Sequence, residues 1–357
     1  MIVNRVLEVR DRSAVKTLQA FLADWWDQYH LDALYAPVES GDRRGVTMQL
    51  IEDPVDLKGV NPFAPVMLGN SATTADRLIQ EHQYEHLAVM LRPCELRAFV
   101  ELQKRAKPAR GQTPAVVIGV DCLGTFSRDD FSSHVQAHGM DALIGDVLRN
   151  ATDGGLRQQG FRTACQICDW PAPRGADIAI GTIGVPTGQI LLLLSRDEAT
   201  DKALGLDLLV RGAASEYEVS HRETIIGAIA DTRAGMRRTM VEEMQGTCRF
   251  DDLGCILAWI ASCSQCGECL EACPLHDGEV AELISQRGAA TVEHTALGNL
   301  VSLSRWLASC SGCGMCEEQC VMDVPLFLLI SALSHSIRDK MHYHSGDPAQ
   351  PLPWRSV

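Results

Sequence analysis

The sequence has little positive charge and no apolar run long enough to cross a membrane. Its 357 residues include 32 Lys and Arg against 46 Asp and Glu, a formal net charge of -14 at pH 7. A phosphate backbone needs a basic face, so this balance argues against nucleic acid as a partner. The longest apolar runs, 188–194 and 324–333, fall well short of the ~20 residues of a transmembrane helix. We therefore expect no nucleic-acid partner and no membrane span.

Three further features are missing. No apolar core of a secretion signal follows Met1, so we expect a cytoplasmic protein. No G-x-G-x-x-G follows a predicted strand, so a Rossmann-type NAD site is not supported. No cysteine precedes Cys94, whereas ten of the 14 lie between Cys248 and Cys320. In a reducing cytosol, cysteines are more often metal ligands than structural disulfides.

Residues 1–245 alternate between helix-like and strand-like segments. Apolar residues recur at helical spacing over 13–30, and short apolar runs bounded by turn residues mark the candidate strands. We predict hairpins over 31–53 and 176–195, and a parallel strand–helix–strand unit over 86–120. A further helix is expected over 221–244. These patterns predict a mixed α/β N-terminal domain.

Residues 246–342 show mostly helical spacing. The candidate helices are 251–262, 278–288, 294–309 and 324–339. The Pro-rich tail, 343–357, is expected to be irregular. The predicted fold class is therefore α+β, with a mixed α/β domain over 1–245 followed by an α-helical domain over 246–342.

Two runs of four cysteines share one spacing. CSQCGECLEACP (263–274) is C-x2-C-x2-C-x3-C followed by proline, and CSGCGMCEEQCV (310–321) repeats the spacing without that proline. Three thiolates so spaced can wrap one cubane iron–sulfur cluster, while the fourth ligates the other cluster. Gly267, Gly312 and Gly314 allow the tight turns that this requires. The spacing predicts two [4Fe-4S] clusters, one on Cys263, Cys266, Cys269 and Cys320, the other on Cys310, Cys313, Cys316 and Cys273.

The alternative is that these cysteines bind zinc. Zinc ribbons use two cysteines per knuckle and four ligands in all, which two runs of four fit poorly. The 36 residues between Cys273 and Cys310 have helical spacing. The pattern over about 250–340 resembles the α-helical di-cluster ferredoxin modules of heterodisulfide reductase C-type and succinate dehydrogenase-type subunits.

Four more cysteines lie upstream. Cys94 and Cys122 each follow a predicted strand, so parallel strands would bring both to the carboxyl edge of the sheet, where α/β folds build their sites. Cys165 and Cys168 form a C-x-x-C. From spacing alone, this pair is a redox dithiol, half of a zinc site or half of a third cluster. Cys94 and Cys122 could equally be inert buried thiols, the role we assign to Cys248 and Cys255.

Three motifs carry a second resemblance. RPCELRAF (92–99), IGVDCLGTF (118–126) and CQICDWPAPRGADIAIGTIG (165–184) are similar to segments of the β subunits of coenzyme F420-reducing hydrogenase and F420-dependent formate dehydrogenase. Chlorophyll-pigment reductases belong to the same group. The resemblance covers roughly 30–200 and implies a domain that holds FAD and a [4Fe-4S] cluster.

The resemblance assigns a third cluster to Cys94, Cys122, Cys165 and Cys168. The motif residues expected to bind the flavin or its partner are Arg92, Pro93, Asp121, Asp169, Asp177, Gly181 and Gly184. The implied function is an iron–sulfur flavoprotein subunit of a redox complex. It would pass electrons between F420, or another hydride carrier, and a hydrogenase, formate dehydrogenase or heterodisulfide reductase-like subunit. No Ser-His-Asp or paired-carboxylate pattern predicts catalytic residues of another kind.

The sequence departs from the family pattern in three places. Members usually carry a Ser-Gly-Gly element before an early helix, and none precedes 13–30. Their Pro-Cys element usually continues with Gln, where this chain has Glu95. Their ferredoxin module often precedes this domain, and here it follows. The missing glycines favour an alternative, a flavin-free electron-transfer or adaptor subunit with three clusters.

Overall fold

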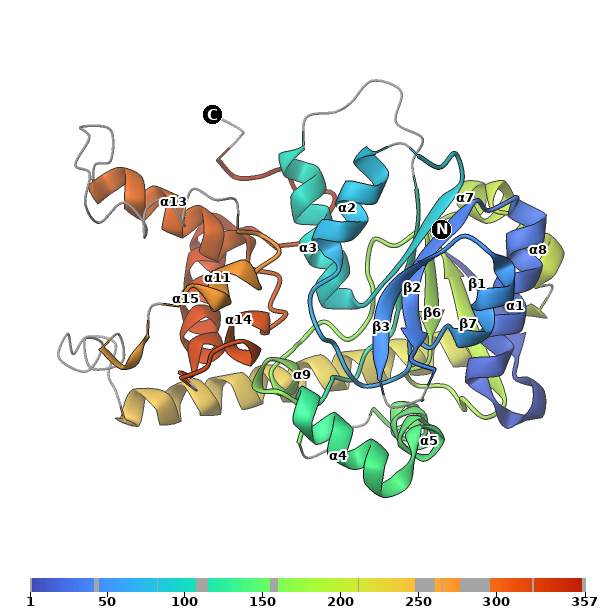
Figure 1. The fold of residues 1–357 in the computed structure, drawn as a ribbon, viewed down its shortest axis with the longest axis horizontal. Coiled ribbons are helices and arrows are strands. Elements are labelled where there is room, and N and C mark those ends of the chain that lie inside the picture. The colour runs from blue at the N-terminus through green and yellow to red at the C-terminus, as the bar shows by residue number, and fades with distance from the viewer. Residues whose placement is uncertain are drawn as a thin grey trace.

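The centre of the fold is a mixed β-sheet (Figure 1). The structure, a computed structural model, describes residues 2–41, 45–81, 83–106, 115–154, 160–210, 212–247, 261–264, 266–276, 296–322 and 324–354. Within them the strand order is β3-β2-β4-β5-β6-β7-β1-β8, with β2, β4, β5 and β6 parallel and the flanking pairs antiparallel. The strands are β1 (Val3–Glu8), β2 (Ala33–Glu39), β3 (Val46–Ile51), β4 (Leu87–Leu91), β5 (Val116–Val120), β6 (Ile178–Gly181), β7 (Ile190–Ser195) and β8 (Gly212–Ala213).

Helices cover both faces of this sheet, which gives three layers. One face carries α1 (Ala14–Tyr29), α4 (Arg128–His138), α5 (Met140–Thr152) and part of α9 (Glu216–Thr247). The other carries α2 (Ala72–Gln80) and α3 (Pro93–Arg105). Along β4, Met90 faces the first layer and Val89 the second, because successive side chains of a strand alternate. Strands covered on both faces are apolar throughout, as β4 and β5 are.

The C-terminal helices pack beside the sheet rather than on it. They are α11 (Glu268–Glu271), α13 (Ala296–Ser309), α14 (Met315–Glu318) and α15 (Leu326–Met341). Figure 1 shows α9 running beneath both the sheet and this group, and α9 contacts both α15 and α6 (Thr163–Gln166). The remaining short helices are η1 (Arg10–Arg12), η2 (Pro54–Gly59), α7 (Glu198–Ala203) and α8 (Leu206–Leu209).

The tail after α15 is irregular but packed against α3. The backbone N–H of Gly346 donates to the buried carboxylate of Glu101, 2.8 Å away, and the Tyr343 hydroxyl donates to the same oxygen. The Ser345 hydroxyl donates to the carbonyl of Ser309 at 2.7 Å. Leu352 is buried as well. The tail therefore joins the C-terminal helices to the sheet domain.

The predicted fold class is confirmed. The helices predicted at 13–30, 221–244, 294–309 and 324–339 and both predicted hairpins are present, and β4–α3–β5 is the parallel unit predicted over 86–120. The helix predicted at 278–288, most of that at 251–262, and Cys248 and Cys255 lie outside the described residues. The sequence did not indicate β1, α2, α4 or α5. The domain boundaries at 245 and 342 stay predictions.

Candidate iron–sulfur centres and an adjoining cavity

Two of the upstream cysteines meet at the carboxyl edge of the parallel strands. Cys94 lies in the first turn of α3, directly after β4, and Cys122 lies two residues after β5. The backbone N–H of Cys122 donates to the carbonyl of Pro171 at 2.9 Å, which joins this edge to the segment after the C-x-x-C. Burial raises the pKa of Cys122 to about 11, and the neighbouring thiols of Cys165 and Cys168 contribute to this rise.

The C-x-x-C begins in α6 and faces the same edge. The backbone N–H of Thr125 donates to the Cys165 sulfur at 3.3 Å. Burial opposes ionisation of Cys165, but the positive charge of Arg162 and the hydrogen bonds from Thr125 outweigh it and lower the pKa of the thiol. The structure thus brings Cys94, Cys122, Cys165 and Cys168 into one neighbourhood, called the N-terminal thiol set below.

The cysteines of the two runs exchange their fourth members. Burial raises the pKa of Cys316, and the charges of Cys313, Cys310 and Cys273 raise it further. Burial likewise raises the pKa of Cys269, helped by Cys263, Cys266 and Cys320. Each group therefore combines three cysteines of one run with the last cysteine of the other. We call them the inner set (Cys273, Cys310, Cys313, Cys316) and the outer set (Cys263, Cys266, Cys269, Cys320).

The turns of the two runs have the backbone expected of glycine. Gly267, Gly312 and Gly314 have φ values of +86°, +69° and +70°, a region that L-residues with a Cβ rarely adopt. Cys273 is anchored by the indole N–H of Trp306, which donates to its sulfur at 3.3 Å. Burial raises the pKa of Cys273 to about 12, assisted by the charges of Cys313 and Cys310.

The N-terminal thiol set lies against the inner set. Cys94 packs on an apolar cluster formed by Cys313, Met315 and Met67, and the charges of Cys313 and Cys122 both add to the burial that raises the pKa of Cys94. The outer set is the most accessible, because Cys263 and Cys266 are exposed. The three sets therefore follow one another from the sheet edge to the surface.

The donor chemistry of these sets fits iron–sulfur clusters. Each supplies four sulfur atoms, the ligation of a [4Fe-4S] cluster. Buried thiols with raised pKa values are neutral at pH 7, and coordination to a metal deprotonates them. Within the described part of the chain, no three His, Cys, Asp or Glu side chains converge tightly enough for a single metal ion. A cubane is larger than one ion and holds its thiolates further apart.

The other predicted cofactor residues are placed in different surroundings. Arg92 caps α3, and its guanidinium donates to the carbonyl of Ala64 at 2.8 Å. Pro93 is the first residue of α3. The carboxylate of Asp121 is engaged by Arg222 and by the backbone N–H groups of Thr182 and Ile183. Protein groups therefore already occupy both oxygens of Asp121.

Asp169 and Asp177 lie apart from each other. Asp169 pairs with Arg237 of α9 at 2.8 Å, beside the C-x-x-C. Asp177 precedes β6, at the opposite edge of the sheet from Cys122, where it accepts from the Val117 N–H and pairs with Arg196. The structure does not bring Asp177 to the thiol sets.

Gly181 and Gly184 flank the end of β6. A Cβ at Gly184, where φ is +74°, would lie 2.8 Å from the Cα of Arg222. A Cβ at Gly181 would lie 3.0–3.2 Å from Leu192, Leu194 and Arg222. Both glycines therefore allow α9 to pack closely on the sheet.

A cavity of about 300 Å³ adjoins the N-terminal thiol set. Its walls come from β2, β3, the loop before α2, and the start of α3, and include Tyr35, Met48, Met67, Asn70, Arg92 and Glu95. The amide nitrogen of Asn70 is buried there without a hydrogen-bond partner. The Met67 sulfur lies 4.0 Å from that of Cys94. We call this space the Met67 cavity.

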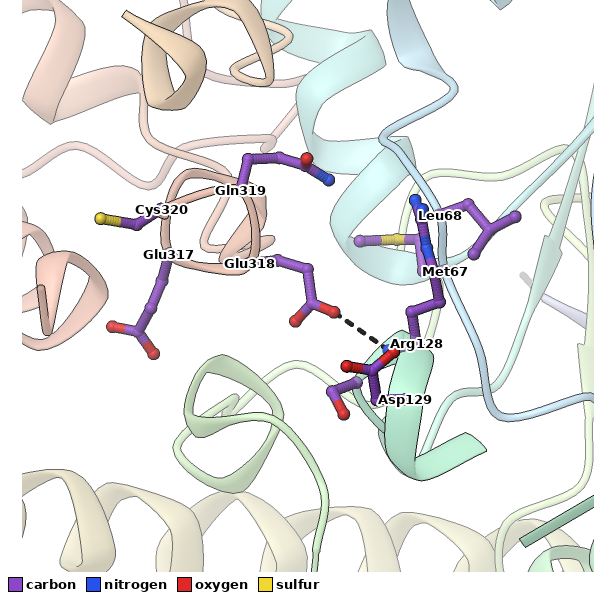
Figure 2. A pocket seen from close by; sticks show the side chains of 9 residues that line it. Met67, Leu68, Arg128, Asp129, Glu317, Glu318, Gln319 and Cys320 are labelled. Atoms are coloured by element: carbon purple, nitrogen blue, oxygen red, sulfur yellow. Dashed lines mark hydrogen bonds between the residues drawn. The ribbon is translucent and has the colours of Figure 1, made fainter. Parts of the chain in front are cut away.

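A second cavity, of about 430 Å³, lies on the other side of Met67 (Figure 2). It separates the start of α4 from the end of α14, and the backbone N–H of Arg128 donates across it to Glu318 at 3.1 Å. In Figure 2 Cys320 points away from this hydrogen bond, toward the C-terminal helices. The cavity marks the seam between the sheet domain and the outer set.

Comparison with known families agrees with this geometry. Residues 84–205 match the family described as the C terminus of the coenzyme F420 hydrogenase/dehydrogenase beta subunit. Residues 259–324 match the family described as 4Fe-4S dicluster domain. The chain thus carries a stretch similar to the C terminus of F420 hydrogenase/dehydrogenase β subunits, followed by a 4Fe-4S dicluster domain. The first holds the N-terminal thiol set, and the second holds the inner and outer sets.

Two individual proteins are similar to parts of the chain. The beta subunit of F420-dependent formate dehydrogenase 1 from Methanococcus maripaludis is 30% identical over 155 residues, 38% of each chain. The match therefore spans well under half of that relative. The F420-reducing [NiFe] hydrogenase complex from Methanosarcina barkeri contains a chain that superimposes with a TM-score of 0.49 and 14% identity, over 69% of this chain and 92% of that one.

The resemblance inferred from the motifs is confirmed for this β-subunit family and for a di-cluster module. None of the described helices combines the length and apolar character needed to cross a bilayer.

Arg97 and Arg162, whose side chains contact the thiols, were not singled out in the sequence. Each lies three residues from a cysteine, Cys94 or Cys165, in a helix or at its start. That spacing could have indicated them.

Proposed function

We propose that the protein is an electron-transfer subunit of a larger redox complex, in which three [4Fe-4S] clusters stand in series. The N-terminal thiol set would hold the first, the inner set the second and the outer set the third. The observation that carries this proposal is the packing of Cys94 on the apolar cluster of Met67, Cys313 and Met315, because it puts a ligand of the first cluster in the neighbourhood of a ligand of the second. Clusters exchange single electrons and flavins exchange two, so a flavin next to the first cluster would join a two-electron carrier to this chain.

We place the reactive ring of FAD in the Met67 cavity. Met67 lies between the cavity and Cys94, with its sulfur 4.0 Å from that of Cys94. Asn70, whose amide nitrogen has no hydrogen-bond partner among the described residues, lines the cavity together with Arg92 and Glu95, and these polar groups would orient the ring. The two-electron partner is F420 or another hydride carrier, as in the family of the first domain.

The far end of the series faces a partner protein. Cys263 and Cys266 are exposed, so the outer cluster lies within reach of another subunit. From the motif resemblance, we expect that subunit to be of the hydrogenase, formate dehydrogenase or heterodisulfide reductase-like class.

Reduction through the series can be tested with a variant that lacks the first cluster. We expect reduced F420 to bleach the iron–sulfur absorption of anaerobic wild-type protein, and to fail with Cys165→Ser/Cys168→Ser. Dithionite should still reduce the two C-terminal clusters of that variant, which controls for their integrity. Unchanged reduction by F420 in the variant would show that electrons do not enter through the N-terminal thiol set.

The second candidate function is a flavin-free adaptor with the same three clusters. The absence of a Ser-Gly-Gly element before α1 favours it. Flavin extracted from anaerobically purified protein distinguishes the two. One FAD per chain supports the flavoprotein, whereas intact clusters without flavin support the adaptor.

A further inference from the structure

Two buried guanidinium groups, those of Arg97 and Arg162, lie near both the N-terminal thiol set and the inner set. Arg162 is 9% exposed and precedes α6. Its Nη2 group lies 3.8 Å from the Cys165 sulfur, and its Nη1 group lies 3.3 Å from the sulfur of Met315. Met315 belongs to the same apolar cluster as Cys313 and Cys94. Arg162 therefore contacts the N-terminal thiol set directly and lies beside the inner set through Met315.

The side chain of Arg162 is fixed by the residues around it. Its Nε donates to the Thr125 hydroxyl at 2.9 Å, and its backbone N–H donates to the Thr125 carbonyl at 3.0 Å. Thr125 in turn contacts the Cys165 sulfur through its N–H and hydroxyl. The guanidinium thus has one orientation relative to Cys165.

The countercharge of Arg162 is supplied by sulfur. Among the residues that the structure describes, no carboxylate lies within ion-pair distance of its guanidinium; Glu318 acts on it only from further away. A buried cation without a partner is strongly unfavourable. The positive charge of Arg162 already lowers the pKa of the Cys165 thiol, and a cluster with four thiolates would supply this negative charge in full. A cluster on the N-terminal thiol set would therefore provide the countercharge of the buried Arg162.

We propose that Arg162 sets the reduction potential of the N-terminal cluster, and acts more weakly on the inner one. This inference rests on the proposed function, because it requires a cluster on the N-terminal thiol set. Reduction adds a negative charge to a cluster, and a fixed cation in a poorly polarisable interior stabilises that charge. Arg162 therefore favours arrival of an electron at the first cluster. It is a positioning residue that acts through electrostatics and is not a ligand.

The test is a potentiometric titration of the anaerobic holoprotein, followed by EPR. Arg162→Gln should shift one one-electron step to a more negative potential, by at least about tenfold in the reduction equilibrium, or ~59 mV. The step is assigned to the N-terminal cluster if it is missing in Cys165→Ser/Cys168→Ser. Arg162→Lys keeps the charge and should titrate close to wild type. Arg174→Gln removes an exposed arginine of the same region, which stacks on Trp170 without a thiol contact, and should shift nothing.

Several results would overturn the inference. An unshifted Arg162→Gln with full iron content shows that the charge does not act on the cluster. If Arg162→Gln loses iron, Arg162→Lys decides: full iron content and a wild-type potential support a charge role, and loss of the cluster in both variants shows a structural role. Failure of the proposed function is a separate result, since wild-type protein without a third cluster would show it before any arginine is changed.

Discussion

Because the C-x-x-C segment contacts the second cysteine run, we predict that replacing two equivalent glycines with alanine destabilises the protein by different amounts. Gly267 and Gly314 occupy the same position of the repeated motif and have similar φ values, +86° and +70°. Among the residues that the structure describes, a Cβ on Gly267 would meet nothing within 4 Å. A Cβ on Gly314 would lie well inside 3.0 Å of the Ala164 Cβ, closer than real Cβ atoms approach. Gly267→Ala is therefore the matched control for Gly314→Ala.

The magnitudes follow from two separate costs. Left-handed backbone costs an L-residue about 1–2 kcal/mol, and both variants share this cost. Overpacking against Ala164 adds about 1–3 kcal/mol to Gly314→Ala alone. At about 2.1 cal/mol/K of unfolding entropy per residue, 1 kcal/mol lowers the midpoint of thermal unfolding of a chain of this length by roughly 1–2 °C. We expect Gly314→Ala to unfold roughly 1–6 °C below Gly267→Ala.

The assay is loss of iron–sulfur absorption on anaerobic heating, at one scan rate because unfolding with cofactor loss is irreversible. Ala164→Gly in the Gly314→Ala background removes the opposing methyl group and should restore most of the difference. Equal midpoints for Gly267→Ala and Gly314→Ala, or no effect of the second change, would refute the close packing of the two domains at this point.

Two buried ion pairs give further predictions. Asp121→Asn leaves Arg222 of α9 buried without its countercharge, so we expect it to lose about 3–5 kcal/mol of stability in chemical denaturation. The control, Asp146→Asn, breaks an exposed pair and should lose less than about 1 kcal/mol. Equal losses would contradict the buried pairing. The hydrogen bond from Arg5 lowers the pKa of Asp201, so this pair stabilises the fold above the ordinary carboxyl pKa of about 3.9 and the effect is lost as the pH falls below it. Asp201→Asn should reduce the acid dependence of unfolding, and an unchanged pH profile would count against the pair.

Patterns of residues within one element were predictable from the sequence. The apolar runs of β4 and β5 indicate buried strands, and short turns between apolar runs indicate hairpins. β1 (VNRVLE) was missed because its polar residues break the apolar run, and its place in the sheet comes from pairing with the distant β7. The polar first turn of α4 likewise hides a helix whose Phe131 and Val135 pack on the sheet.

The sequence predicts the types of ligand in the site and the grouping of the cysteines in the two runs, but not how the groups pack against one another. The spacing of the two runs, read with the ligand exchange known for such clusters, predicts which cysteines group together. Nothing in the spacing indicates that Cys94 packs on the cluster that contains Cys313, or that Arg162 contacts both Cys165 and Met315, because these contacts join segments more than 150 residues apart in the chain. The cofactor role that the motif suggests for Asp121 and Asp177 stays a prediction; in the structure their side chains bind Arg222 of α9 and the Val117 N–H of β5.

The central claim is that the N-terminal thiol set holds a third cluster. Iron and acid-labile sulfide counts on anaerobically purified protein test it most directly. At four irons per cubane, we expect about twelve irons per chain in the wild type and about eight in Cys165→Ser/Cys168→Ser. About eight irons in both proteins would contradict the claim and leave the N-terminal cysteines without a cluster.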